Sequence, residues 1–307
     1  MSSPPPTGAA AESVPENPTP NGAADRSAIV RLVHVRKSFG RQAVLRDISL
    51  EIQRGLTTVV LGPSGCGKSV LLKHIIGLLR PDSGQVWYED VRVDTLSEVR
   101  LGAIRMHFGV LFQQGALFDS MSVRQNVGFS LVEHTDLNAA ERERRIRRVL
   151  RMVGMVDSID KMPSELSGGQ RKRVALARAI ILEPKVILYD EPTTGLDPIR
   201  SDVINELIIK LQSELGITSV VVTHDLSSAF KVADWMVMLY DGQLALEGTP
   251  QVFRDTDHPQ VRRFLLGEAS EEELKGIHAR GGGGRVTETA ATAASDADAN
   301  RSRWRRP

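Results

Sequence analysis

Two glycine-containing segments, about a hundred residues apart, have the composition of anion-binding turns. The first, GPSGCGKS at 62–69, follows an apolar run and precedes an apolar helical pattern. The second, LSGGQ at 166–170, opens a helical segment that continues as RKRVALARA. A glycine-rich turn at a helix N-terminus binds anions because free backbone N–H groups and the helix dipole point toward it. The sequence therefore predicts two phosphate sites in one chain.

The first segment matches GxxxxGKS, the phosphate-binding loop of a strand–loop–helix unit. We expect Lys68 to reach the β- and γ-phosphates of a bound nucleotide and the Ser69 hydroxyl to ligate Mg²⁺. A glycine turn capped by serine is the alternative, and the flanking strand and helix argue against it. The residues assigned to the nucleotide are Gly62, Pro63, Ser64, Gly65, Cys66, Gly67, Lys68, Ser69 and Val70.

Cys66, the only cysteine of the chain, lies inside this loop. A single cysteine excludes an internal disulfide and fits a reducing compartment. Because a helix N-terminus lowers the pKa of a nearby thiol, Cys66 is predicted to react readily with alkylating reagents and to be protected by ATP. An inert small residue that fills the turn is the alternative.

The segment KVILYDEP, at 185–192, carries two acids to the end of an apolar run. Asp190 is predicted to hold the metal, as the second motif of P-loop NTPases does. Glu191 follows it directly, and a carboxylate there can polarise an attacking water. An isolated Asp-Glu pair would indicate only a solvated strand end, but this chain also carries a complete phosphate loop.

Three further side chains are candidates because of their positions. His224 ends the run TSVVVTH, which places it near the γ-phosphate if that run is the next strand of the sheet, although a lone histidine is more often structural. Gln113 follows the run FGVLF, and its amide can bond a metal-bound water. Phe39 precedes the first predicted hairpin and can stack on adenine, with a core phenylalanine as the alternative.

The elements that must position these residues form an α/β pattern. Apolar runs at 57–62, 108–112, 185–190 and 218–224 predict strands of a mostly parallel sheet, separated by helical patterns at 69–79, 169–182 and 201–215. The segment 29–52 alternates apolar and polar residues and predicts antiparallel strands. Residues 120–165 are helical in pattern throughout. The fold class is therefore a P-loop NTPase core with an N-terminal antiparallel β subdomain and a helical insertion at about 115–180.

Composition limits the remaining possibilities. The chain has 307 residues, 41% of them hydrophobic, and a formal net charge of +1, which carries no nucleic-acid footprint. No apolar run approaches the roughly 18 to 20 residues that a membrane helix needs, so the chain is expected to be soluble. Residues 1–28 lack a secretory signal and are expected to be disordered, as is most of 268–307, which leaves 29–267 as the folded part.

In this order, GPSGCGKS, LSGGQ, YDEP, TGLD and TH resemble the motifs of the ATP-binding subunits of ABC transporters, over about residues 29–267. The resemblance implies an ATPase that uses ATP and Mg²⁺ and forms a head-to-tail homodimer. ATP on the 62–69 loop of one subunit would be capped by Ser167, Gly168, Gly169 and Gln170 of the other. The resemblance also implies an integral-membrane permease as partner, and a position on the cytoplasmic side, at the inner face of the cell membrane.

Other P-loop classes fit less well. A GTPase needs an [NT]KxD loop and a kinase needs a phosphoacceptor lid, and neither class has a place for LSGGQ. ABC proteins of translation carry two ATP-binding units, and those of DNA maintenance carry a long coiled coil. A subunit that pairs with a separate permease remains the favoured interpretation, with a non-transport ABC ATPase as the alternative.

Within the family, FGVLFQQGALFDSMSVRQNVGFSLVEHTDL at 108–137 resembles the ATPase of Mla-type phospholipid and organic-solvent-tolerance transporters, whose partner carries an MCE domain. That resemblance implies phospholipid as cargo, with another solute as the alternative. An apolar patch beside Gln113 would receive the permease, formed by Phe112, Leu117, Phe118 and Met121. The arginine-rich segment 141–154 is expected to be a solvated helix face, and the basic end RSRWRRP either touches anionic headgroups or has no role.

Overall fold

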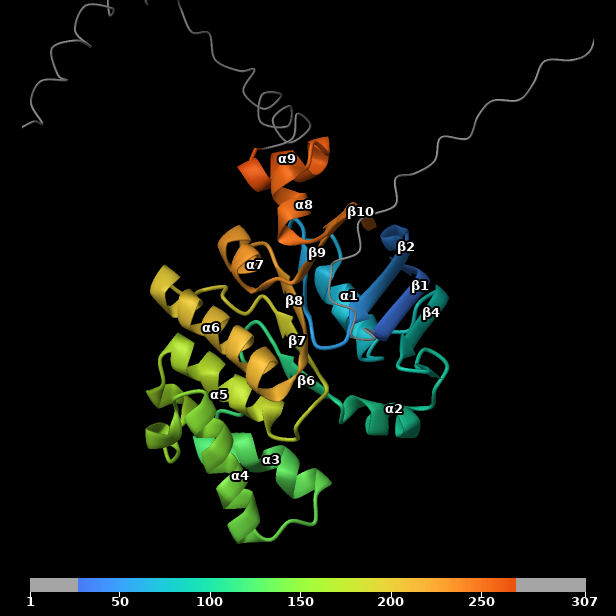
Figure 1. The fold of residues 1–307 in the computed structure, drawn as a ribbon. Helices are drawn as coiled ribbons and strands as arrows, with labels where there is room; N and C mark the ends of the chain where they lie inside the picture. The colour runs from blue at the N-terminus through green and yellow to red at the C-terminus, as the bar shows by residue number, and fades with distance from the viewer. Residues whose placement is uncertain (1–26, 269–307) are drawn as a thin grey trace, which may run out of the picture. The chain divides into compact units, whose positions relative to one another are not determined.

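The computed structural model describes residues 27–268 (Figure 1). The disorder predicted for residues 1–28 and 268–307 therefore falls almost wholly outside the described residues. Contacts divide the chain into two units, 1–254 and 255–307, and each is described by itself. In the second unit the described structure is the end of α8 (Pro250–Asp255) and α9 (Pro259–Leu266). Among residues 27–268, the helices are too short or too polar to cross a bilayer.

Four strands of the first unit form a sheet in the order β2-β1-β4-β5, from β1 (Ala28–Phe39), β2 (Gln42–Gln53), β4 (Ser83–Tyr88) and β5 (Val91–Arg92). All its pairs are antiparallel. Inward-facing residues such as Leu32 and Leu50, which face each other across the β1–β2 pair, are buried. The antiparallel strands predicted for 29–52 are confirmed.

The second sheet has six strands in the order β10-β9-β3-β8-β7-β6. Its strands are β3 (Thr57–Leu61), β6 (Phe108–Leu111), β7 (Val186–Asp190), β8 (Thr218–Thr223), β9 (Trp235–Tyr240) and β10 (Gln243–Gly248). All neighbours are parallel except β10, which pairs antiparallel with β9. The four predicted strands are confirmed to within one residue at each end, and β9 and β10 extend the sheet beyond β3.

Strand β3 lies in the interior of this sheet, between β8 and β9. Each of its five residues is buried, which is the burial that a continuous apolar run in a parallel sheet requires. Its last residue, Leu61, stands opposite Thr223 of β8 and Met238 of β9. The carboxyl ends of β3, β7 and β8 therefore meet at one edge of the sheet. The residues predicted to act on the nucleotide lie at or just after these strand ends.

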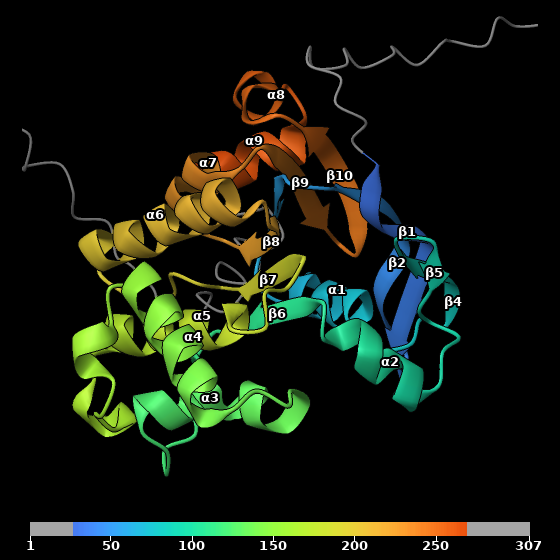
Figure 2. The same cartoon turned by 60° about the horizontal axis from the view of Figure 1, so that its bottom comes forward.

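Helix α1 (Lys68–Ile75) fills the space between the two sheets, where Leu71 and Ile75 share one core cluster with residues of both. Helices α5 (Gly168–Ile180) and α6 (Pro198–Leu215) contact β6 and β8 and cover the opposite face of the six-stranded sheet (Figure 2). Two shorter helices, α2 (Glu98–Arg105) and α7 (Leu226–Val232), complete this part of the unit.

Helices α3 (Val123–His134) and α4 (Ala139–Met152) lie in the predicted helical insertion and pack against α5 (Figure 2). The arginine-rich helix α4 buries Ile146, Val149 and Leu150. Arg144, which is 77% exposed, Arg145 and Arg147 pair with glutamates of the same helix, while Arg148 pairs with Glu183 beyond α5. This structure agrees with the predicted solvated helix face. The proposed domain limits stay a prediction.

Candidate nucleotide-binding site

The 62–69 loop joins β3 to α1, and its shape depends on glycine at two positions. A side chain at Gly62 would place its Cβ 2.2 Å from the carbonyl oxygen of Leu239, so the strand edge admits only glycine. Gly67 is the N-cap of α1 with φ of 108°, a conformation that other residues rarely adopt. The loop therefore turns tightly into the helix, with its backbone N–H groups at the α1 N-terminus.

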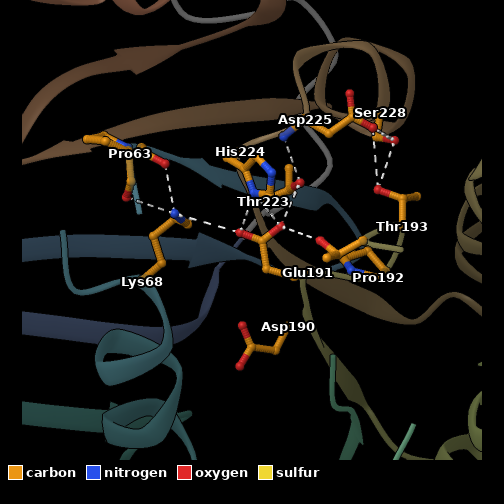
Figure 3. A network of polar contacts seen from close by, with 12 residues as sticks. Pro63, Lys68, Asp190, Glu191, Pro192, Thr193, Thr223, His224, Asp225 and Ser228 are labelled. Carbon is orange, nitrogen blue, oxygen red and sulfur yellow. Dashed lines mark hydrogen bonds and ion pairs between the residues drawn. The ribbon is translucent and has the colours of Figure 1, made fainter. Parts of the chain in front are cut away.

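Lys68 lies in the loop rather than along the helix surface. Its side chain is 7% exposed, and its Nζ donates to the carbonyl oxygens of Gly62 at 2.7 Å and Pro63 at 3.0 Å. The same ammonium is 3.7 Å from Oε1 of Glu191 (Figure 3). Lys68 therefore brings a positive charge to the carboxyl end of β3, facing the acid that follows β7.

Asp190 and Ser69 form the candidate metal site. The Ser69 hydroxyl donates to Oδ1 of Asp190 at 2.9 Å, across 121 positions of sequence. Burial raises the pKa of Asp190 above its usual range, with a further rise from the Glu191 carboxylate and an opposing contribution from Ser69. A divalent cation at this carboxylate would offset the cost of its burial. The donor set, a hydroxyl and a carboxylate, consists of the hard oxygen ligands that Mg²⁺ prefers.

Gln113 shares a groove with this pair. The groove has a volume of about 480 Å³, and its lining includes Ser69, Asp190, Gln113, Phe112, Leu72 and Ile76. Phe112 is 42% exposed there. The rest of the predicted apolar patch is not part of this lining, since Phe118 packs instead on Phe129, at 5.1 Å between ring centres, and beneath Arg178.

Glu191 is the centre of the polar network in Figure 3. Its carboxylate accepts from the hydroxyls of Thr194 at 3.2 Å and Thr223 at 3.3 Å, and lies 2.9 Å from Nδ1 of His224. The residue has a φ of 50°, in the left-handed region that only a few per cent of non-glycine residues adopt. The structure therefore brings Glu191, His224 and Lys68 together from three separate parts of the sequence.

Phe39 ends β1 with its ring 47% exposed, so the alternative that it is a core residue is wrong. The Nζ atom of Lys37 lies 5.6 Å from the ring centre. Asp82 holds this segment by accepting from Lys37 Nζ at 2.7 Å and from the backbone N–H of Ser38 at 2.6 Å. An exposed aromatic ring on a fixed strand end is available for stacking on a base.

LSGGQ forms the N-terminus of α5 through a reciprocal capping box. The backbone N–H of Gln170 donates to Oγ of Ser167 at 3.3 Å, and the backbone N–H of Ser167 donates to Oε1 of Gln170 at 2.8 Å. Ser167 is exposed, while Gly168 and Gly169 leave room for Leu196 and Arg200. Within residues 27–268, no hydrogen bond or ion pair joins 167–170 to 62–70. The two predicted phosphate sites are thus not joined by polar contacts within one chain.

The prediction that Cys66 is reactive assumed a lowered pKa of its thiol, and that assumption is wrong. Burial raises the pKa of the Cys66 thiol, and this outweighs the lowering by Lys68 and by the backbone N–H groups of the loop. Cys66 packs against the hydrophobic core cluster between the sheets. The burial of the thiol, which the sequence does not reveal, therefore decides the direction in which its pKa shifts.

We therefore expect alkylation of Cys66 by iodoacetamide at pH 8 to be slower in the folded chain than in the chain unfolded in urea, where the pKa is that of a free thiol. The unfolded chain is an internal control because it carries the same single thiol. Alkylation of the folded chain at or above the unfolded rate would contradict the assignment of a raised pKa.

Two groups of side chains in this region were not among the predicted site residues. Lys172 of α5 is 6% exposed and reaches the main chain after Glu191. A hydroxyl network joins the same segment to α7, because the hydroxyl of Ser228 donates to Asp225 Oδ2 at 2.6 Å and lies 3.4 Å from that of Thr193 (Figure 3). Basic and hydroxyl residues are common on helix surfaces, so the sequence did not distinguish these side chains from ordinary surface residues.

Comparison with known proteins agrees with this geometry. A family model described as "ABC transporter" matches residues 45–194. The intermembrane phospholipid transport system ATP-binding protein MlaF of Escherichia coli K12 is 41% identical over 245 residues, covering 79% of this chain and 91% of the relative. This chain belongs to the ABC transporter ATP-binding proteins. It is therefore an ABC ATPase, which binds and hydrolyses ATP.

Two other matches, one to a sequence relative and one to a solved structure, also belong to this family. The "Probable ribonucleotide transport ATP-binding protein mkl" of Mycobacterium tuberculosis H37Rv is 43% identical over 231 residues, covering 75% of this chain and 64% of the relative's own length. A dimeric structure of the ATP-binding cassette MJ0796 bound to ADP and Pi superposes with a TM-score of 0.67 at 34% identity, covering 72% of this chain and 98% of the cassette. The ABC nucleotide-binding fold is confirmed by these matches.

Proposed function

We propose that this ABC ATPase hydrolyses MgATP with Glu191 as the general base. The supporting observation is the position of its carboxylate, 2.9 Å from His224 Nδ1 and 3.7 Å from Lys68 Nζ. A water that attacks the γ-phosphorus would lose its proton to Glu191 as the bond to the leaving ADP oxygen breaks. His224 holds the carboxylate in place and Lys68 stabilises charge on the phosphates.

The other site residues have binding roles in this proposal. The backbone N–H groups of 62–70 hold the phosphates, and Phe39 stacks on adenine. Ser69, Asp190 and Gln113 hold Mg²⁺, directly or through water. When bound, Mg²⁺ supplies positive charge that neutralises the phosphate oxygens during hydrolysis. The proposed domain extends over residues 29–267.

The separation of the two phosphate sites supports a dimer. Because 167–170 has no polar contact with 62–70 within the described residues, LSGGQ is free to face the nucleotide of a second subunit. The related cassette MJ0796 is dimeric in its ADP- and Pi-bound structure. We infer a head-to-tail homodimer in which the exposed Ser167 and the N-terminus of α5 complete the partner's ATP site.

The groove beside Gln113 is the proposed contact with an integral-membrane permease. It combines the exposed Phe112 with Leu72 and Ile76, and it extends to the candidate metal pair Ser69–Asp190. An apolar helix seated there would touch the nucleotide site through Gln113. We accordingly propose that the subunit lies at the inner face of the cell membrane, on the cytoplasmic side.

The proposed cargo is phospholipid, moved between membranes with an MCE-domain protein as a further partner. The resemblance of 108–137 to Mla-type ATPases supports it, as does the match that covers 91% of MlaF. The mkl relative, whose name refers to ribonucleotides, is similar at nearly the same identity but over 64% of its length. A ribonucleotide or another small solute is therefore the competing outcome.

Deletion of the gene should disturb envelope lipid distribution and raise sensitivity to detergent, because the permease would lose its energy source. The measurement is the phospholipid content of the outer envelope layer, beside uptake of labelled nucleosides and nucleotides. A matched strain that carries Glu191→Gln in place of the deletion should show the same defect if hydrolysis is the cause. Normal lipid distribution with lost uptake of one small solute would contradict the lipid cargo.

A further inference from the structure

Lys172 is a buried lysine that no part of the proposed chemistry uses. It lies in α5, two residues after Gln170, with its side chain 6% exposed. Its Nζ donates to the carbonyl oxygens of Pro192 at 2.7 Å and Thr194 at 2.8 Å, and approaches that of Glu191 at 3.4 Å. A lysine ammonium has three donors and no acceptor, so three converging carbonyls account for all of them.

These carbonyls belong to a segment in an unusual conformation. Glu191 has a φ of 50°, although it is neither glycine nor asparagine, and such a conformation persists only where the surroundings enforce it. On one side, the backbone N–H of Glu191 donates to the carbonyl oxygen of Val222 in β8 at 2.9 Å. Lys172 holds the other side of the same segment. The main chain that carries the candidate base is thus fixed between β8 and α5.

The ammonium has little else to stabilise its charge. Burial lowers the pKa of Lys172 to about 8, opposed by the carboxylate of Glu191. An apolar side chain in its place would leave the carbonyls of Pro192 and Thr194 without this donor, so some stability would be lost as well. Its neighbours on α5, Arg171 and Arg173, bond carbonyls elsewhere, at Leu166 and at Val153 and Gly154.

We propose that Lys172 is a positioning residue that ties the LSGGQ helix to the main chain of Glu191–Thr194 and so holds the Glu191 carboxylate in its reactive place. This inference rests on the proposed role of Glu191 as the base. It also gives α5 a role within its own subunit, because a shift of the helix that carries Ser167–Gln170 would be transmitted through one side chain to Glu191.

The test is Lys172→Met in the full-length chain, with Arg173→Met as the matched control. Lys172→Met should lower kcat for ATP hydrolysis by about 10- to 100-fold, the loss expected when a reacting group is displaced by roughly 1 Å. The KM for ATP and the Kd for a fluorescent ATP analogue should change by less than about threefold. The melting temperature should fall by less than about 10 °C, because two buried carbonyls lose a donor while the chain still folds. Lys172→Gln, which keeps two donors, should retain more activity than Lys172→Met. Arg173→Met should keep the parent kcat.

A double-mutant cycle with Glu191→Gln separates this inference from the proposed function. If Lys172 acts through Glu191, Lys172→Met should cause little further loss in the Glu191→Gln background, measured in single turnover. A full additional loss there, a parent-like kcat in Lys172→Met, or loss of folding in both Lys172 variants would overturn the positioning role. Parent-like hydrolysis by Glu191→Gln alone would instead overturn the assignment of the base.

Discussion

Replacing Glu191 by glutamine should lower kcat for ATP hydrolysis by about 10²- to 10⁴-fold, the contribution of a positioned acid–base group. Glutamine keeps the shape of the side chain and its hydrogen bonds from Thr194 and Thr223, but it cannot accept a proton from water. The affinity for ATP should stay nearly unchanged, because the phosphates are held by the 62–69 loop. Dimers stabilised by ATP should therefore accumulate, and size-exclusion chromatography with MgATP would detect them.

Glu183→Gln is the matched control for this experiment. Glu183 also has a positive φ, of 54°, and it also pairs with a basic side chain, at 3.0 Å from Arg148. It lies on the surface after α5, away from the phosphate loop, so its replacement should leave kcat unchanged. Hydrolysis by Glu191→Gln at the parent rate would show that another group takes the proton.

Substitutions at Lys68 and Ser167 should separate the two phosphate sites. Lys68→Ala removes the buried ammonium beside Glu191, so the Kd of an isolated subunit for ATP should rise by about 10- to 100-fold, as loss of a charge-assisted hydrogen bond predicts. Ser167→Arg should leave that Kd nearly intact, because Ser167 has no polar contact with the loop in its own subunit. It should block ATP-dependent dimerisation through its bulk and charge.

The control for Ser167→Arg is Ser164→Arg, because Ser164 is also exposed and lies in the short 3-10 turn (Pro163–Glu165) just before it. Ser167→Asp adds a second test. Aspartate also serves as a helix N-cap, so α5 should begin normally, while its negative charge would repel the phosphates of a partner's ATP. Equal loss of ATP affinity in the isolated Lys68→Ala and Ser167→Arg subunits would contradict the division between the two sites.

Most of the nucleotide-binding region was predictable because its elements leave a clear signal in residue type. The run 57–61 is apolar throughout and is buried on both faces of the sheet, and the glycines at 62 and 67 are required by a close approach and by a positive φ. Ser167 and Gln170 form a capping box, which the spacing of LSGGQ permits. In each case the requirement shows in the residue types of a short stretch, even where, as at Gly62 and Leu239, the contact joins distant positions.

The residues that escaped prediction act through partners distant in sequence. Lys172 bonds main-chain carbonyls some twenty positions later. Every residue has a carbonyl oxygen, so residue types in the sequence do not indicate such a contact. The pKa of Cys66 depends on burial between two sheets rather than on the nearby helix terminus. Strands β9 and β10 were missed as well, and β10 has partly exposed residues along most of its length, as its position at the sheet edge implies.

The place of β3 between β8 and β9 has a consequence for synthesis of the protein on the ribosome. Both neighbours of β3 come from far downstream, since Leu61 pairs with Thr223 and Met238. At 5 to 20 residues per second, β3 must wait roughly 10 to 35 s after its own translation before the end of β9 is made. During that interval its apolar residues have no sheet to join, while β1, β2 and β4 can already pair. The nascent chain thus carries its phosphate loop early but completes the strands on both sides of it only late.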